Sequence, residues 1–241
     1  MTLVNKTLRV LSEGGVRAGL IHVFVADQHE FDEYLRVVPK HLYGTLVVGV
    51  VGLSKQHAFI NRYFPEGKHV VSMDDDVAAV LMLGKGRANL TLVPLVRLDV
   101  FFETCFTDLK RAGLHLCGVY PVPNAFFMRP QPRSTTVLKF IQGPFYAYVN
   151  RHDSDLVCHE QEKQDYELSI LTFIKDGGVL RYNHVAMKTQ MADPMSRREG
   201  HRVAALSLVK RFPQYARLKV RKEGRYEIAL KSEIKRKNEI T

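Results

Sequence analysis

The sequence predicts a mixed α/β fold with a mainly parallel sheet, helices on both faces of that sheet and a β-rich C-terminal half. In the first half, short apolar segments rich in β-branched residues alternate with amphipathic segments of helical period, which is the order of a parallel sheet. The strand-like segments are apolar without alternation, as expected of strands that are covered on both faces. In the second half, strand-like segments outnumber helical ones.

The first predicted strand covers Leu20–Val25, which is short, apolar and β-branched. A helix over Gln28–Val38 follows, because its apolar residues recur every three to four positions. Thr45–Val51 is typical of a central strand. A helix is predicted over residues 54–64, with Ser54 as its N-terminal cap. His69–Met73 is the third strand. The resulting β-α-β-α-β order predicts parallel strands.

The rest of the chain is less regular, and prolines mark loops between residues 121 and 132. The predicted helices are Asp99–Ala112, Asp165–Ile174 and Arg198–Phe212. The predicted strands are His115–Tyr120, Val137–Ile141, Phe145–Val149, Val179–Tyr182, Arg217–Arg221 and Tyr226–Leu230. We expect Val137–Ile141 to pair with Phe145–Val149, and the last two strands to form a hairpin around Gly224.

The positive charge is concentrated at the C-terminal end. The chain has 241 residues and a formal charge of +10. From His201 onward there are 12 Lys and Arg against 4 Asp and Glu, so this segment carries +8 and residues 1–200 only +2. A nearly neutral body with a basic end suggests a polyanionic partner such as nucleic acid, although a solubilising C-terminus would have the same composition.

Cysteine count and hydropathy exclude several classes of protein. Cys105, Cys117 and Cys158 are odd in number and none form a C-x-x-C pair, which argues against a disulfide framework or a zinc ribbon. No apolar run approaches the roughly 20 residues that a membrane-spanning helix needs, and no signal peptide is evident. We therefore expect a soluble cytoplasmic protein with no membrane partner.

Three adjacent aspartates, Asp74, Asp75 and Asp76, follow the third predicted strand. A solvated acidic turn is the simplest explanation of such a triplet. Here, however, it lies between two apolar segments, where charge is costly unless something compensates it. Ligands of parallel α/β sheets bind beyond the carboxyl ends of the strands, and carboxylate oxygens suit Mg²⁺ or Mn²⁺. We predict that Asp74 and Asp76 bind a divalent metal ion.

This arrangement resembles the D-x-D signature of glycosyltransferases with the GT-A fold, which is a Rossmann-like α/β fold. The resemblance implies that a nucleotide sugar and a metal ion meet at the triplet. It also implies a single glycosyltransferase domain over residues 1–241. Within it, residues 1–83 would be the nucleotide-sugar-binding half, 84–200 the acceptor half and 201–241 a basic C-terminal segment.

The spacing from Phe24-Val25 through Val51-Gly52-Leu53 to Met73–Val77 is similar to glycosyltransferases associated with the thymine and 5-methylcytosine hydroxylases, which include the base J glucosyltransferase and its phage relatives. The resemblance implies transfer of a hexose, glucose from UDP-glucose, to the hydroxyl of 5-hydroxymethylcytosine or 5-hydroxymethyluracil in DNA. The nucleotide-sugar-binding residues would be Phe24, Val25, Gly52, Lys55, Asn61, Arg62, Asp74 and Asp75. For Lys55 and Arg62, an ordinary solvated helix face is the alternative.

A second acidic segment, Asp165-Tyr166-Glu167, lies at a predicted helix start, where the helix N-terminus stabilises carboxylates. It resembles the acidic x-E-D motif of GT-A enzymes, which implies that Asp165, or else Glu167, is the catalytic base. On its own, the segment is better explained as the N-terminal cap of an amphipathic helix. GT-A folds often supply a late histidine to the metal, and His184 is the position we select, with His201 as its competitor.

The acceptor and DNA contacts are the least defined part of the prediction. The DNA partner would contact Tyr120, Asn124, Gly143, Arg197, Arg198, Arg202, Lys210 and Arg211. The sequence leaves open whether the base is flipped out of the duplex.

Three other functions are compatible with parts of the sequence. A GT-A glycosyltransferase acting on a glycan or a small molecule shares the acidic triplet. A non-catalytic DNA-binding protein explains the charge but not the triplet. A metal-dependent nuclease or nucleotidyltransferase also uses clustered carboxylates. No P-loop or G-x-S-x-G motif is present.

Overall fold

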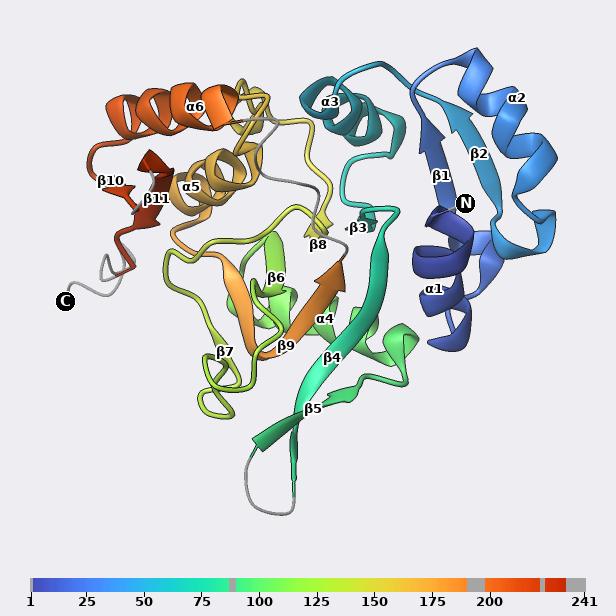
Figure 1. Ribbon diagram of the computed structural model, residues 1–241, viewed down its shortest axis with the longest axis horizontal. Helices are drawn as coiled ribbons and strands as arrows, with labels where there is room; N and C mark the ends of the chain where they lie inside the picture. The colour runs from blue at the N-terminus through green and yellow to red at the C-terminus, as the bar shows by residue number, and fades with distance from the viewer. Residues whose placement is uncertain (1, 87–89, 190–197, 222–223, 233–241) are drawn as a thin grey trace.

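The computed structural model describes residues 2–86, 90–189, 198–221 and 224–232, and in these the chain is mixed α/β. Strands β1 (His22–Val25) and β2 (Thr45–Val48) form a parallel pair, as predicted. Helix α2 (Gln28–Val37) packs beside them, and helix α1 (Arg9–Glu13), which continues a π-helical turn over Val4–Leu8, completes this lobe (Figure 1). The side chain of Asp27 caps α2 by accepting from the amide of Glu30 at 2.9 Å.

A seven-stranded sheet forms the centre of the molecule, with β7 paired outside the main path. Its order is β3 (His69–Met73), β8 (Phe145–Val149), β6 (Leu116–Tyr120), β9 (Leu180–Thr189), β4 (Val77–Lys85) and β5 (Leu90–Pro94), and β7 (Ser134–Thr135) pairs with β9. Only β6 and β9 are parallel, and all other neighbours in this sheet are antiparallel. The sheet is thus mixed, and the prediction of a mainly parallel sheet was wrong.

Strand β3 pairs with β8 and not with β1 or β2, because Asn150, directly after β8, binds the end of the helix that precedes β3. Helix α3 (Leu53–Tyr63) ends beside Asn150, which is fully buried. Its side-chain amide donates to the carbonyls of Asn61, Phe64 and Pro65 at 2.9, 2.7 and 3.1 Å. Its backbone amide donates to the carbonyl of Lys68. The chain therefore enters β3 already aligned with β8, and it pairs there antiparallel.

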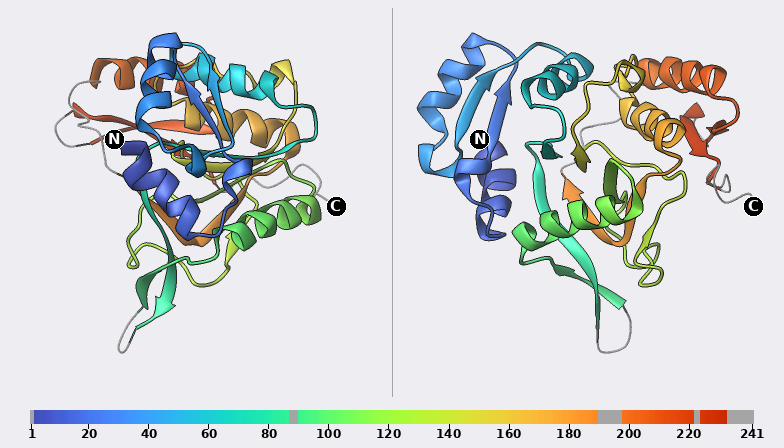
Figure 2. Two further views of the ribbon diagram at one scale, coloured as in Figure 1. Left: turned by 90° about the vertical axis from the view of Figure 1, so that its right-hand side faces the viewer. Right: turned by 180° about the vertical axis from the view of Figure 1, so that it is seen from behind.

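Helices cover both faces of the large sheet, as predicted. Helix α4 (Leu98–Ala112) packs on one face, through a core that includes Phe101, Cys105 and Leu109 (Figure 2). Helix α5 (Gln164–Asp176) packs on the other face, where Phe173 joins Leu116. Helix α6 (Arg198–Arg211) and the hairpin of β10 (Ala216–Val220) and β11 (Tyr226–Leu230) lie outside α5. Short 3₁₀ turns cover Ala18–Leu20, Lys40–Leu42 and Ser154–Leu156.

Other differences from the prediction concern strands. Residues 137–141 form no strand: Leu138 and Ile141 are buried in the core beside Phe173, and the amide of Ile141 donates to the Ser169 hydroxyl at 2.9 Å instead of to a neighbouring strand. β4, β5 and the N-terminal helix were not predicted, and β9 extends seven residues past Tyr182. The hairpin around Gly224 is confirmed.

Candidate functional site

The acidic turn of residues 74–76 connects β3 to β4, and two sets of contacts fix its backbone. The amide of Asp74 donates to the carbonyl of Pro144 at 3.2 Å, which attaches the turn to the segment before β8. On the other side, the Thr7 hydroxyl donates to the carbonyl of Asp74 at 2.6 Å and accepts from the amide of Val77 at 3.0 Å. The turn is therefore held between the N-terminal helix and the start of β8.

Negative charge accumulates at this turn. Asp74 and Asp76 are half-buried, and Asp75 is exposed. Burial, followed by the charges of Asp76, Asp75 and Asp165, raises the pKa of Asp74 from 3.8 to about 6. The ionised form of Asp74 is thus disfavoured both by desolvation and by repulsion. Asp165 is distant from Asp74 in the sequence, but it is close enough in the fold for its charge to contribute to the raised pKa of Asp74.

Asp165 lies in the first turn of α5. Burial raises the pKa of Asp165 to about 6, although hydrogen bonds from the amides of Tyr166 and Gly143 and the charge of Lys163 act in the opposite direction. The turn that begins at Gly143 therefore contacts Asp165 and, through its next residue, Asp74. Lys163 has a φ of 60° just before the helix. A left-handed conformation is unusual for lysine and is typical of positions where the backbone is constrained near a site.

Glu167, the alternative base, is engaged elsewhere. Its side chain is fully buried, and one carboxylate oxygen accepts from the amides of His159 and Glu160 at 2.9 and 2.8 Å. The other oxygen lies 2.6 Å from a guanidinium nitrogen of Arg211. A carboxylate held in this way joins α5 to α6 and to the loop before α5, and is not available to an acceptor. Of the two candidates, Asp165 is the one placed to act as a base.

The two histidines considered as metal ligands lie apart from the acidic turn. His184 is in β9, where Nδ1 is 3.0 Å from the carbonyl of Arg133 and the ring packs edge-on against Tyr182. Burial lowers the pKa of His184. His201 is in the first turn of α6, with Nε2 3.6 Å from a carboxylate oxygen of Glu162. In the described part of the chain, no three His, Cys, Asp or Glu side chains are arranged to hold a metal ion.

Four of the residues predicted to bind the nucleotide sugar lie in β1 and at the start of α3, outside the pocket described below. The ring of Phe24 packs edge-on against Tyr63, with the ring centroids 5.2 Å apart, and Val25 is buried in the small core. Gly52 immediately precedes α3 with a φ of +101°, a conformation that side-chain-bearing residues rarely adopt. Lys55 is exposed on α3. Phe24 and Val25 therefore support the fold at this position.

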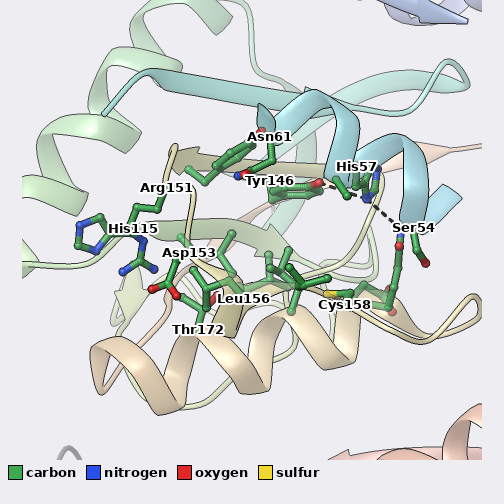
Figure 3. Close-up of a pocket in the computed structure, with 18 of the residues that line it drawn as sticks. Ser54, His57, Asn61, His115, Tyr146, Arg151, Asp153, Leu156, Cys158 and Thr172 are labelled. Carbon is green, nitrogen blue, oxygen red and sulfur yellow. Dashed lines mark hydrogen bonds between the residues drawn. The ribbon is translucent and has the colours of Figure 1, made fainter. Parts of the chain in front are cut away.

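A pocket of about 420 Å³ opens between α3, β8 and α5. Asn61 and Arg62 line it from α3, Gly143 from the turn before β8, and Asp165 from α5, so four predicted site residues meet there. Figure 3 shows Tyr146 in the middle of its wall. At one end are Arg151, His115 and Asp153, and at the other are Ser54, His57 and Cys158.

Several polar residues of this pocket were not predicted from the sequence, among them Tyr146, Gln164 and His57. Tyr146 is buried in β8, and its hydroxyl is 3.5 Å from Nδ1 of His57. The side-chain nitrogen of Gln164 lies 2.9 Å from the same His57 atom. Burial lowers the pKa of His57 to about 4, so its ring is neutral near neutral pH. Gln164 adjoins Asp165 in sequence, which is the one signal that pointed to it.

The basic residues predicted to contact DNA differ in their surroundings. Arg198 and Lys210 are exposed at the two ends of α6. Arg202 pairs with Glu199 at 2.6 Å, and Arg211 is part of the buried network with Glu167. Arg197 lies outside the described residues. Of the predicted basic residues that the structure describes, Arg198 and Lys210 are thus the two that are exposed on this helix and for which no ion pair is described above.

Tyr120, at the end of β6, and Asn124, in the loop that follows, do not line the pocket. The guanidinium of Arg181 lies 5.0 Å from the centre of the Tyr120 ring. The Asn124 side chain accepts from the amide of Phe126 at 3.0 Å and shapes the loop. Both have roles in local structure.

Comparison with known proteins found no family model that matches the chain and no matching curated protein. No helix among the described residues is both long and apolar enough to cross a membrane. The functional argument therefore depends on the residues of the chain itself.

Proposed function

We propose that this protein is a metal-dependent GT-A glycosyltransferase that transfers glucose from UDP-glucose to the hydroxyl of a 5-hydroxymethylpyrimidine in DNA. The observation that carries the proposal is that the turn of Gly143 and Pro144 connects the two acidic segments: the Gly143 amide bonds the Asp165 carboxylate, and the Pro144 carbonyl accepts from the amide of Asp74. A carboxylate base that lines a pocket and an acidic turn attached to the same segment suit a metal-dependent transfer. The D-x-D resemblance of the acidic turn supports the same reaction.

The residues of the acidic turn fit a divalent cation. Asp74 and Asp76 offer carboxylate oxygens, which Mg²⁺ and Mn²⁺ prefer. Every neighbouring charge that affects the pKa of Asp74 is a carboxylate, so a cation would relieve the repulsion. When bound, the cation would stabilise the negative charge that develops on the departing diphosphate. His184 is not included in this proposal, because its ring is held in β9 by the carbonyl of Arg133.

Asp165 would act as the general base. The acceptor hydroxyl would give its proton to the Asp165 carboxylate while the hydroxyl oxygen forms a bond to the anomeric carbon of glucose. The bond between that carbon and the diphosphate breaks, and its electron pair leaves with UDP. A pKa of about 6 keeps Asp165 mostly ionised at neutral pH and yet close to the pH at which a base is most effective.

DNA is the proposed acceptor because of the distribution of charge. The segment from His201 onward carries +8, and Arg198 and Lys210 are exposed on α6 beside the site-bearing helix α5. Exposed cations of this kind bind phosphates and make the affinity dependent on salt. A glycan or small-molecule acceptor would not need them.

The test combines donor binding with product analysis. Calorimetry with UDP-glucose should give binding that requires Mn²⁺ and that Asp76→Ala abolishes, whereas Asp32→Ala, at an exposed carboxylate of α2, should bind as the wild type does. Nucleosides from hydroxymethyl-DNA incubated with protein, UDP-glucose and Mn²⁺ should gain the mass of one hexose. Metal-independent donor binding would contradict the proposed donor site. Transfer to a glycan or to water alone would contradict the DNA acceptor.

A further inference from the structure

The outer face of the C-terminal hairpin carries a row of cations. Strands β10 and β11 pair antiparallel, and successive side chains along β10 point to opposite faces of the hairpin. Arg217, Lys219 and Arg221 are exposed and follow one another at every second position, so they share one face. Glu227 lies opposite Lys219 on the same face, but its carboxylate is already engaged, 2.6 Å from the guanidinium of Arg221. Arg217 and Lys219 therefore keep their full charge.

The opposite face of the hairpin fixes its orientation. Ala216 and Ile228 are buried there, in a core cluster with Ile170 of α5 and Leu208 of α6. Figure 1 shows the hairpin beside these two helices, at the opposite end of the molecule from α2. Because the apolar face is buried against the helices, the cationic face must point to solvent.

In the described part of the chain, the two cations have no partner: neither the Arg217 nor the Lys219 side chain makes a hydrogen bond or an ion pair there. On α6, by contrast, Arg202 is paired with Glu199. Side chains two positions apart in a strand lie about 6.8 Å from each other, so like charges there repel unless an anion lies against them. The hairpin thus presents two adjacent, unneutralised cations on a rigid support.

The cationic face adjoins the helix end that carries the proposed base. Burial lowers the pKa of Lys163, and the charges of Asp165 and Glu227 act in the opposite direction. Burial also raises the pKa of Tyr166, and the same two carboxylates add to this rise. Both carboxylates are therefore near the first turn of α5, and Glu227 shares its face of the hairpin with Lys219. A polyanion bound on this face would lie next to Asp165.

The composition of the face suits the phosphates of nucleic acid more than a membrane. A membrane-binding surface combines its cations with large apolar side chains that enter the lipid. Here the residue opposite Arg217 is Ala229, and none of the described residues on this face is a large apolar one. Contacts to phosphates, by contrast, need exposed cations in fixed positions, which the hairpin supplies.

We propose that the outer face of the β10–β11 hairpin binds the phosphate backbone of duplex DNA through Arg217 and Lys219. The choice of DNA as the polyanion rests on the proposed function. Contacts of this kind fix the position of the duplex and do not read its sequence. The hairpin would therefore hold the acceptor beside Asp165 whatever the surrounding base sequence.

The test removes two charges from the hairpin and, as a matched control, two from the other lobe. Arg217→Gln combined with Lys219→Gln neutralises the proposed contacts. Arg36→Gln combined with Lys40→Gln neutralises two exposed cations in and just after α2. The affinity for a fluorescent duplex without hydroxymethyl groups is measured by anisotropy over a range of salt concentrations, with neither donor nor metal present. Thermal unfolding checks that both double variants are folded.

We expect the hairpin variant to lower the log–log salt slope by about 1.8, the effect of two phosphate contacts, and to bind at least about tenfold more weakly at low salt. The control should bind as the wild type does. On hydroxymethyl-DNA, the hairpin variant should raise KM and leave kcat nearly unchanged, because Asp165 is intact.

An unchanged salt slope in the hairpin variant would overturn the inference, and so would an equal loss in the control, which would indicate diffuse attraction by the net charge. Binding of the wild type to phosphatidylserine vesicles and not to DNA would assign the face to a membrane and would also overturn it. Hairpin-dependent DNA binding without any sugar transfer would uphold the inference and contradict the proposed function alone. Sugar transfer to DNA with an unchanged slope in the hairpin variant would do the reverse.

Discussion

Asp165→Asn should make the protein more stable and inactive at the same time. In the folded protein, burial raises the pKa of Asp165 from 3.8 to about 6. A raised pKa of this size corresponds to about 3 kcal/mol at pH values where the carboxylate is ionised. Asparagine avoids this cost but has one acceptor oxygen where the carboxylate has two, and we expect the weaker hydrogen bonding to lose about 1 kcal/mol. The net gain should be about 2 kcal/mol.

The gain must depend on pH in a defined direction. Because the folded pKa of Asp165 is raised, its protonation favours the folded state below about pH 4, and this contribution is lost as the pH rises through 6. Thermal unfolding at pH 7.5 should therefore show Asp165→Asn melting about 4–8 °C above the wild type, a difference that disappears near pH 4. Comparison with Asp32→Asn, at an exposed carboxylate, corrects for the general effect of removing one negative charge.

Activity provides the second half of the test. Loss of a general base typically lowers the rate about 10²–10⁴-fold, so transfer to hydroxymethyl-DNA should fall by that factor while UDP-glucose binding persists. In the wild type, the rate should rise with pH through about 6, where Asp165 ionises. A variant that is no more stable at pH 7.5 and that still transfers sugar would refute both the electrostatic reasoning and the catalytic role.

Four further variants test other parts of the structure. Arg211→Ala leaves the buried Glu167 carboxylate without its cation, so we expect a loss of about 3 kcal/mol in thermal unfolding. Arg198→Ala should leave stability unchanged and lower the log–log salt slope of DNA binding by about 0.9. Gly52→Ala forces a side chain into a conformation with a φ of +101°, and should cost about 1–3 kcal/mol in chemical denaturation. Thr7→Val removes both hydrogen bonds between the Thr7 side chain and the acidic turn, so Mn²⁺-dependent UDP-glucose binding should weaken severalfold in calorimetry; unchanged affinity would show that the turn does not need this anchor.

Local signals in the sequence predicted most elements correctly, but not their pairing. The apolar run of β3 and the helical periodicity of α5 are patterns of residues close together in the sequence, so both elements were predicted. The partner of β3 depends on Asn150, which is eighty residues away and binds the end of α3 with its buried amide. A polar residue followed by a loop gives no sequence signal for such a contact. β4 and β5 were not predicted, because the apolar segment that follows the acidic turn was assigned to no element.

For the candidate site, residue type was informative where the chemistry is uncommon. An acidic triplet between apolar segments pointed to Asp74, and a carboxylate at a helix start pointed to Asp165. Residue type alone did not distinguish Asp165 from Glu167, because both lie in the first turn of α5. Only the fold brings Arg211 beside Glu167. Gln164 and His57 were missed because glutamine and histidine are common, and their importance comes from burial and from contact with each other.

The contrast between acidic residues within this one chain supports the proposed site. Asp176, 5% exposed, is held by Arg151 and approached by His115, and Glu167, fully buried, is held by Arg211 and two backbone amides. At both of these acids, the fold thus supplies a cation from its own side chains. At Asp74 the neighbouring charges are all negative, and the protein tolerates the resulting cost of ionisation. Such an exception is expected where a cation is to be supplied from outside the chain, and it is the reason for placing the metal ion at this turn.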